Sequence, residues 1–331
     1  MRLKDIGEIG FIKRIESGCL VRDKKVIRGI GDDCCVFKAS GRMAILLTTD
    51  MLVEKIHFLL GSISPYELGR KSLAVNLSDI AAMGGTPREA VISIAIPDTV
   101  DLAILDGVYD GMKSMAKEFE VNILGGDTTS SPEHLVINVA LVGEAAEDEI
   151  LYRSGAGEGE VIFLTGPVGS SAAGLDLILK GREIQGWEAL IEAHHNPYPH
   201  IEAGRIIAST KKANSLIDVS DGVAADLGHI CTESGLGAIL EERMIPTTET
   251  FREYCKRFHE DSNHLSLHVG EDYVLLGTAV AGAANELRAA LESEGLEFHQ
   301  IGQMVAEPGL RFRTRENSLE SMETSGWDHF R

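Results

Sequence analysis

Aspartate recurs along the sequence in five short motifs that also carry Gly, Ser, Thr or Asn. The motifs are Gly29-Ile30-Gly31-Asp32-Asp33, Thr48-Thr49-Asp50, Asn76-Leu77-Ser78-Asp79, Gly125-Gly126-Asp127-Thr128-Thr129 and Asp218-Val219-Ser220-Asp221-Gly222. Carboxylates that converge on one cleft repel each other unless divalent cations lie among them. Magnesium takes one or two carboxylates together with water and substrate phosphate, and glycine lets a phosphate approach the backbone closely. The recurrence therefore indicates magnesium-dependent phosphoryl transfer.

Several of the motifs also have a simpler interpretation. The first can be a solvated loop, and the second and fourth can be turns or caps. The third differs, because Asp79 falls in an apolar helical stretch, where a carboxylate is costly to bury unless it is paired or bound to a metal. The sequence contains no Walker A motif, kinase Gly-rich loop or Ser-His-Asp signature that would indicate another chemistry.

The formal net charge of -20 argues against nucleic acid or an anionic membrane as a partner, because both would be repelled. A phosphorylated small molecule stays compatible, since divalent cations reverse the local sign of charge. The charged opening segment and the lack of an apolar run of about 20 residues predict a cytoplasmic protein. Five cysteines without C-x-x-C spacing are expected to be reduced.

The elements that position the first four motifs alternate between strand and helix patterns, which predicts a mixed α/β domain. Ser64, Pro65 and Glu67 form a helix start, and Gly84-Gly85 and Pro87 end that helix after Met83. Apolar residues spaced by three and four predict a second helix. The expected elements are strands at 44–49, 121–124 and 135–142, with helices at 64–83 and 101–118.

A chain of 331 residues suits two domains, and the acidic stretch 144–149 is the expected crossing. We place the boundary near residue 148, giving domains 1–148 and 149–331. The second half begins with a strand, a Gly-rich turn and a helix. Its expected strands are 161–165, 216–219, 237–240, 273–278 and 297–303, with helices between them.

Read in order, these motifs resemble the thiamine-monophosphate kinase family, in the superfamily of aminoimidazole ribonucleotide synthetase and selenophosphate synthetase. The resemblance covers nearly the whole chain. It also includes 52–58, 74–84, Arg153, Gly270-Glu271-Asp272-Tyr273 and the closing Gly326-Trp327-Asp328-His329-Phe330. His57 and the Trp-Asp-His-Phe ending point to the thiamine branch.

The resemblance implies a fold and a set of site residues. The fold is α/β (α+β), with an N-terminal domain that pairs across a dimer barrel and a C-terminal α/β domain. The implied magnesium ligands are Asp32, Thr48, Thr49, Asp50, Asp79, Asp127, Asp218 and Asp221. The implied ATP contacts are Tyr109, Gly126, Asp127, Arg153 and Ser220, and the implied thiamine monophosphate contacts are His57, Glu271 and Trp327. Asp50, Asp127, Arg153 and Asp221 are expected to carry catalysis.

Two positions depart from the family pattern, namely Cys34-Cys35 after the paired aspartates and Val269 before Gly270. The implied reaction transfers the γ-phosphoryl group of ATP directly to thiamine monophosphate. A phosphate monoester is largely dianionic at neutral pH, so this acceptor needs no general base. Three alternatives stay open: another ATP-dependent member of the superfamily, a silent binding protein that keeps the sites, and an acidic calcium-binding module. The last is disfavoured because no Asp-x-Asp-x-Asp-Gly loop with a closing glutamate occurs.

Overall fold

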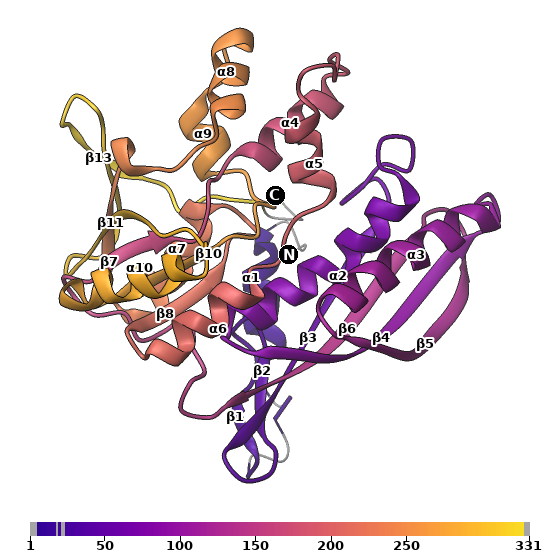
Figure 1. Cartoon of the computed structure of the whole chain (residues 1–331), viewed down its shortest axis with the longest axis horizontal. Coiled ribbons are helices and arrows are strands. Elements are labelled where there is room, and N and C mark those ends of the chain that lie inside the picture. The colour runs from indigo at the N-terminus through magenta and orange to yellow at the C-terminus, as the bar shows by residue number, and fades with distance from the viewer. Residues whose placement is uncertain (1–4, 18, 21–23, 328–331) are drawn as a thin grey trace.

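The computed structural model describes residues 5–17, 19–20 and 24–327. Within this part of the chain the strands form two sheets, a six-stranded sheet from the first half and a seven-stranded sheet from the second half (Figure 1). The closing residues Asp328, His329 and Phe330 lie outside the described residues.

The six-stranded sheet has the order β1-β2-β3-β6-β4-β5. A short helix, α1 (Gly7–Ile15), precedes it. The strands are β1 (Val26–Arg28), β2 (Cys35–Lys38), β3 (Met43–Val53), β4 (Thr86–Pro97), β5 (Asn122–Ser131) and β6 (Val136–Ala146). Side chains on the long strands alternate between a buried inner face and a more exposed outer face.

Two helices, α2 (Pro65–Ala82) and α3 (Leu102–Glu118), run together over the inner face of this sheet (Figure 1). The predicted helix start is confirmed, because Ser64 and Glu67 form a reciprocal capping box at the first turn of α2. Glycine permits the close packing of the two helices. A Cβ atom at Gly69 would lie 1.8 Å from the Val108 carbonyl oxygen, and one at Gly111 would lie 1.9 Å from that of Tyr66.

The seven-stranded sheet has the order β13-β12-β9-β11-β7-β10-β8. Its strands are β7 (Val161–Leu164), β8 (Ala213–Asp218), β9 (Gly237–Glu241), β10 (Leu275–Ala279), β11 (His299–Val305), β12 (Gly309–Arg313) and β13 (Leu319–Met322). The helices of this half are α4 (Ser170–Leu179), α5 (Glu188–His195), α6 (Ile201–Thr210), α7 (Val223–Ser234), α8 (Glu249–Phe258), α9 (Ser262–Leu267) and α10 (Ala284–Ser293), with 3-10 turns η2 (Glu242–Met244) and η3 (Ala281–Ala283).

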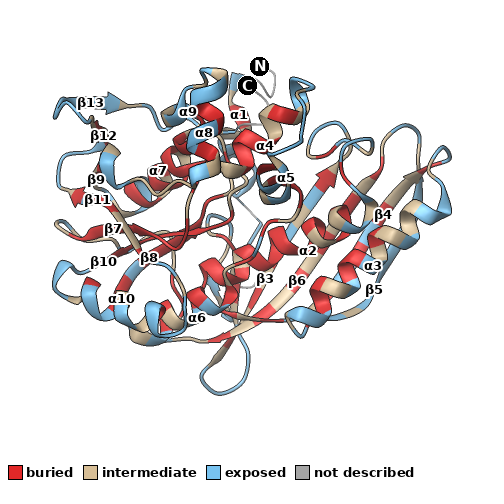
Figure 2. Cartoon of the chain, turned by 45° about the horizontal axis from the view of Figure 1, so that its top comes forward, coloured by how far each residue is buried: buried red, intermediate tan, exposed pale blue. Residues whose placement is uncertain are grey.

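The buried core is continuous between the two halves, and α2 is buried along most of its length (Figure 2). One cluster of packed apolar residues includes Leu46 of β3, Leu77 of α2, Phe163 of β7 and Ile201 of α6. Gly204 allows α6 to pack closely against α2, since a Cβ atom at Gly204 would lie 2.1 Å from the carbonyl oxygen of Ala81. Elements of both halves therefore hold α2 in place.

The structure corrects several expected boundaries. The strand predicted at 121–124 continues to Ser131, so the Gly125–Thr129 motif lies inside β5 and not beyond it. Strand β3 continues four residues past Thr49, and β1, β2, β4, β12 and β13 were not predicted. Among the described helices, none combines the length and apolar composition needed to cross a membrane. The five cysteines are unpaired.

Candidate active site

The second and third motifs meet where β3 packs on α2. Strand alternation points Thr48 and Asp50 inward, and the Thr48 hydroxyl donates a short hydrogen bond to Oδ2 of Asp79. The side-chain oxygen of Asn76 accepts the backbone N–H of Asp50 at 3.0 Å. These contacts fix the backbone of Asp50 next to the carboxylate of Asp79.

The other half of the chain adds Asp218, the last residue of β8. The hydroxyl of Ser78 donates to its Oδ2 at 2.6 Å, which joins the end of β8 to α2. Carboxylate oxygens of Asp33, Asp79 and Asp218 all lie within 4.8 Å of one another. Residues 185 positions apart thus form one carboxylate cluster at the junction of the two halves.

Burial and mutual repulsion make this cluster costly to ionise. Burial raises the pKa of Asp79 well above its ordinary value, and the charges of Asp50 and Asp218 raise it further. The pKa values of Asp50 and Asp218 are also raised, mainly by burial. Oδ2 of Asp33 is buried with no hydrogen-bond partner among the described residues. Oxygen atoms arranged in this way are stabilised by protons or by a hard divalent cation.

The paired aspartates Asp32 and Asp33 have different surroundings. Arg28 Nε lies 3.1 Å from Oδ2 of Asp32, and the Arg153 backbone N–H donates to Oδ1 of Asp32 at 3.2 Å. Burial, and then the charge of Asp33, raise the pKa of Asp32 to about 6. Asp33, which the sequence analysis did not assign, joins Asp79 and Asp218, and it also pairs with Arg153 Nη2 at 2.5 Å. Asp32 therefore lies behind the cluster and Asp33 within it.

A second group of possible ligands adjoins the first. Ligand atoms of Asp221, Asp226 and His229 lie within 4.8 Å of one another. Asp226 accepts the backbone N–H groups of Asp221 at 3.3 Å and Gly222 at 3.1 Å, so it holds the turn that carries Asp221. Neither Asp226 nor His229 was predicted, because both face inward from the first turns of α7 and lie outside the motif.

Thr49 and Asp127 do not join the cluster within one chain. Thr49 faces the outer side of the sheet, where its hydroxyl donates to the carbonyl of Val139 at 2.9 Å. Asp127 pairs with Ser93, an exposed outer-face residue of β4, and is itself exposed. Strand β5 lies three strand spacings from β3, roughly 14 Å across the sheet. Both residues are thus on the outer face, opposite Asp50 and Asp79.

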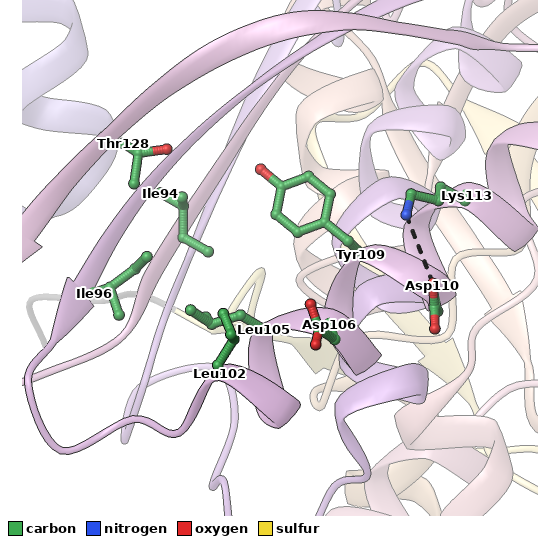
Figure 3. A pocket seen from close by; sticks show the side chains of 9 residues that line it. All are labelled: Ile94, Ile96, Leu102, Leu105, Asp106, Tyr109, Asp110, Lys113 and Thr128. Atoms are coloured by element: carbon green, nitrogen blue, oxygen red, sulfur yellow. Dashed lines mark ion pairs between the residues drawn. The ribbon is translucent and has the colours of Figure 1, made fainter.

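Tyr109 lines a cavity of about 540 Å³ between α3 and the strands β4 and β5. Figure 3 shows its ring directed toward Ile94 and Thr128, with Lys113 on its other side and Asp106 and Leu105 below it in this view. The remaining lining residues are Ile94, Ile96, Leu102, Asp110 and Lys113. Gly126 lies on the adjoining segment of β5, where a Cβ atom would be 1.6 Å from the Ile92 carbonyl oxygen.

The predicted acceptor contacts come from three separate loops. Lys71 Nζ lies 3.0 Å and His194 Nδ1 lies 3.1 Å from Oε2 of Glu271. Burial alone would raise the pKa of Glu271, but Lys71 and His194 hold it below its ordinary value, and His57 adds to this effect. Nδ1 of His57 accepts the backbone N–H of Val53 at 2.9 Å.

Trp327 and Ser220 adjoin Asp221 through the backbone. The Trp327 N–H donates to the Asp221 carbonyl at 3.2 Å, and its side chain is 55% exposed. The Ser220 carbonyl accepts the N–H of Glu271 at 2.8 Å. These bonds place the Glu271 loop and the end of the described chain beside the Asp218–Gly222 motif.

The two departures from the family pattern are accommodated by local packing. Cys34 is buried, and its Sγ donates to the Asp79 carbonyl at 3.6 Å. Val269 packs against the small apolar cluster of α4, α5, α8 and α9. Neither substitution displaces a carboxylate of the cluster.

Comparisons with known proteins agree with this geometry. Residues 31–145 match the model of the AIR synthase related protein, N-terminal domain, and residues 157–315 match that of the C-terminal domain. The thiamine-monophosphate kinase of Bacillus subtilis is 34% identical over 92% of this chain and 93% of its own, and that of Escherichia coli K12 is 35% identical over 98% of both. A solved structure of AaThiL complexed with AMPPCP and TMP superposes with a TM-score of 0.85 and 31% identity over 99% of both chains. The chain belongs to the thiamine-monophosphate kinase family.

Proposed function

We propose that this protein transfers the γ-phosphoryl group of ATP to thiamine monophosphate, giving thiamine diphosphate and ADP, as a step of thiamine diphosphate biosynthesis. The observation that carries the proposal is the convergence of Asp33, Asp79 and Asp218 on one buried point, in a chain of this family. A family member has been solved with AMPPCP and TMP bound. The alternative of a calcium-binding module accounts for none of these relatives.

Magnesium fits the cluster. The donor atoms are carboxylate and hydroxyl oxygens, which magnesium prefers, and the buried Oδ2 of Asp33 lacks a hydrogen-bond partner among the described residues. From the predicted set we propose Thr48, Asp50, Asp79, Asp218 and Asp221 as magnesium ligands. We add Asp33 as a ligand, and we propose that its neighbour Asp32 supports Asp33. When bound, magnesium would neutralise the charges of the two phosphate-bearing reactants and so reduce their mutual repulsion.

The protein's own residues would position the reactants. Tyr109 and the backbone at Gly126 would hold the nucleotide through the cavity in Figure 3, with Arg153 and Ser220 near its phosphates. His57, Glu271 and Trp327 would hold the acceptor. An oxygen of the acceptor phosphate forms a bond to the γ-phosphorus while the bond from that phosphorus to the β–γ bridging oxygen breaks. Because the acceptor is dianionic, no side chain needs to remove a proton.

We also propose that two copies pair through the outer face of the six-stranded sheet. Apolar side chains stand exposed there, including Met51 at 53% and Val91 at 46%. Helices α2 and α3 both lie on the other face, so neither of them covers this surface (Figure 1). Pairing through it would bring Asp127 of one copy to the Thr49 side of the other, which would give Asp127 a catalytic role that one chain alone does not provide.

Domain division and location complete the proposal. A boundary near residue 148, separating 1–148 from 149–331, is supported by its position between the two matched regions. A cytoplasmic location is supported by the five unpaired cysteines, which a reducing compartment maintains.

Steady-state turnover tests the reaction. Purified protein with ATP, magnesium and thiamine monophosphate should release ADP and thiamine diphosphate in equal amounts, and omission of the acceptor should stop ADP release. Absence of the diphosphate product would overturn the proposed substrate. Screening other phosphate-ester acceptors would then separate the remaining members of the superfamily.

Subunit mixing tests the shared site. Asp50→Asn and Asp127→Asn proteins should each be inactive alone. Mixing them after mild dissociation should restore about a quarter of wild-type activity, because half of randomly paired dimers are mixed and each carries one intact site. Failure of a verified mixed dimer to recover activity would place Asp127 and Asp50 in the same copy's site.

A further inference from the structure

The buried side chain of Asp32 connects one arginine to the backbone of a cluster residue. Oδ1 of Asp32 accepts the backbone N–H groups of Asp33 and Arg153, each at 3.2 Å. Oδ2 of Asp32 lies 3.1 Å from Nε of Arg28 in an ion pair, and the Asp32 side chain is fully buried. The position of the Asp33 backbone therefore depends on the contact between Asp32 and Arg28.

Arg28, the last residue of β1, is itself held by two further hydrogen bonds. Its Nη2 donates to the carbonyl oxygen of Gly31 at 2.9 Å, which closes the turn that carries the paired aspartates. Gly31 has φ +115, a conformation that glycine adopts readily. The same Nη2 donates to Oε2 of Glu233 on α7 at 3.0 Å. Arg28 thus fixes the turn in one conformation and ties it to the second half of the chain.

The carboxylate of Asp33 is oriented by donors on one of its two oxygens. Oδ1 accepts Nε of Arg153 at 3.1 Å and Nη2 of Arg153 at 2.5 Å. Oδ2 is buried without a hydrogen-bond partner among the described residues, and the carboxylate belongs to the cluster with Asp79 and Asp218. Because Asp32 binds the backbone N–H groups of both Asp33 and Arg153, a shift of Asp32 would move both members of this ion pair.

Loss of the Arg28 side chain would leave the buried carboxylate of Asp32 without its cationic partner. A buried charge that loses its partner is strongly destabilised. Asp32 can relieve this by turning toward water, which would release the backbone N–H groups of Asp33 and Arg153. The Asp33 carboxylate would then be held less precisely in the cluster, so a metal ion there would meet a poorly oriented ligand.

We propose that Arg28 is a positioning residue for magnesium binding, because through Asp32 it fixes the backbone that presents Asp33 to the carboxylate cluster. The inference rests on the proposed function, in which Asp33 is a magnesium ligand. It adds Arg28 and its partner Glu233, which are neither proposed ligands nor proposed contacts of the reactants. Residues that hold metal ligands in place contribute about 10–100-fold to metal affinity or activity. The role is recognised by a loss of magnesium affinity that a high magnesium concentration overcomes.

The experiment measures magnesium affinity in two ways. The rise in Tm with magnesium concentration, recorded without nucleotide, gives a dissociation constant. The magnesium dependence of turnover gives the half-saturating concentration. Arg28→Met should raise both values about 10-fold or more, while kcat at saturating magnesium stays within about 3-fold of wild type. Arg28→Lys, which keeps a cation beside Asp32, should restore much of the affinity.

Arg313→Met is the matched control. Arg313 on β12 pairs with Glu241 at 3.0 Å, and its side chain is 33% exposed, against 29% for Arg28. Its removal should leave both magnesium values unchanged. If Arg28→Met does not fold, Glu233→Gln carries the test, with Glu241→Gln as its control. Glu233→Gln should raise the magnesium dissociation constant by a smaller factor than Arg28→Met, and it should have no further effect where Arg28 is already Met.

The outcomes separate the inference from the proposed function. Wild-type protein that binds no magnesium would overturn both. Wild-type protein that binds magnesium but does not phosphorylate thiamine monophosphate would overturn the proposed reaction, and the binding measurement would still decide the role of Arg28. An unchanged magnesium dissociation constant in Arg28→Met, or in Glu233→Gln where that variant carries the test, would overturn the positioning role alone. An equal loss of affinity in Arg313→Met would also overturn it, because loss of any arginine–glutamate pair would then suffice.

Discussion

Asp79→Asn should stabilise the metal-free protein. At 4.8 Å, each ionised neighbour in the cluster repels Asp79 by about 3.5 kcal/mol at an effective dielectric constant of about 20. Proton uptake limits this cost, because the carboxyl group can become neutral instead. Protonating a carboxyl group with an ordinary pKa near 3.9 costs about 1.4 kcal/mol for each pH unit above that value, or roughly 4 kcal/mol at pH 7. Asparagine removes the cost and can still accept the Thr48 hydroxyl. The expected gain is up to about 6 °C in Tm at pH 7.

The sign of the pH dependence follows from the raised pKa of Asp79. The folded wild type binds a proton that the unfolded chain has already lost, so its stability falls as pH rises above about 4. The advantage of Asp79→Asn should accordingly be small at pH 4 and grow toward pH 7. Magnesium should narrow the difference at pH 7, since wild type gains about 2.7 kcal/mol at 100 times the dissociation constant and the variant gains less.

Thermal unfolding in EDTA and in magnesium, at several pH values, checks this prediction. Asp98→Asn, which changes an exposed carboxylate in the turn before α3, is the control and should alter neither melting curve. A variant that melts at or below wild type in EDTA at pH 7 would refute the repulsion argument. A variant that retains the full magnesium shift would remove Asp79 from the metal ligands.

Three further changes have defined outcomes. Asp50→Asn should lower kcat by about a hundredfold or more in the turnover assay, with little change in Tm. Loss of a residue that only hydrogen-bonds to a metal ligand already lowers activity or metal affinity by about 10–100-fold. Burial lowers the pKa of His200 from its ordinary value of 6.5 to about 4. The contribution of neutral His200 to the free energy of unfolding is therefore complete above pH 6.5, and roughly 3 kcal/mol of it is lost as the pH falls from 6.5 to 4. His200→Gln should reduce this loss, as measured by urea unfolding at several pH values. Gly126→Ala should cost more than about 2 kcal/mol by urea unfolding, because its Cβ would collide with the Ile92 carbonyl oxygen and push β5 away from β4. A normal midpoint for this variant would show that β5 adjusts freely.

Local patterns were sufficient for features that local energetics determine. The start of α2 follows from Ser64 and Glu67, and the amphipathic stripe of α3 from its spacing. Strand β4 was missed because its outer face is also apolar at Val91 and Ala95, which obscures the alternation with buried Ile92 and Ile94. The Gly-rich motif of β5 was placed beyond its strand because glycine has a low strand propensity. There, pairing with β4 overrides local preference.

The site itself depended on tertiary geometry. Which of two adjacent aspartates faces inward is decided by Arg28, four residues before Asp32, and by Arg153, which lies 120 residues after Asp33 in the sequence. Lys71 and His194 are 123 residues apart and share no motif. One local signal was available: a lysine in an otherwise apolar helix must find a partner if the helix is buried.

Helix α2 generalises that signal, because four of its polar side chains each meet a partner on another element: Lys71 with Glu271, Asn76 with the backbone of Asp50, Ser78 with Asp218, and Asp79 with Thr48. Lys71 and Ser78 are seven residues apart, two helical turns, so they share the side that faces the second half of the chain. Asn76 and Asp79 are three apart and share the side that faces β3. The rise between Lys71 and Ser78 is about 10 Å, which fixes the separation between the Glu271 contact and the carboxylate cluster. One inserted residue between them would turn Lys71 by about 100° relative to Ser78, so the helix could then no longer make both the Glu271 and the Asp218 contacts.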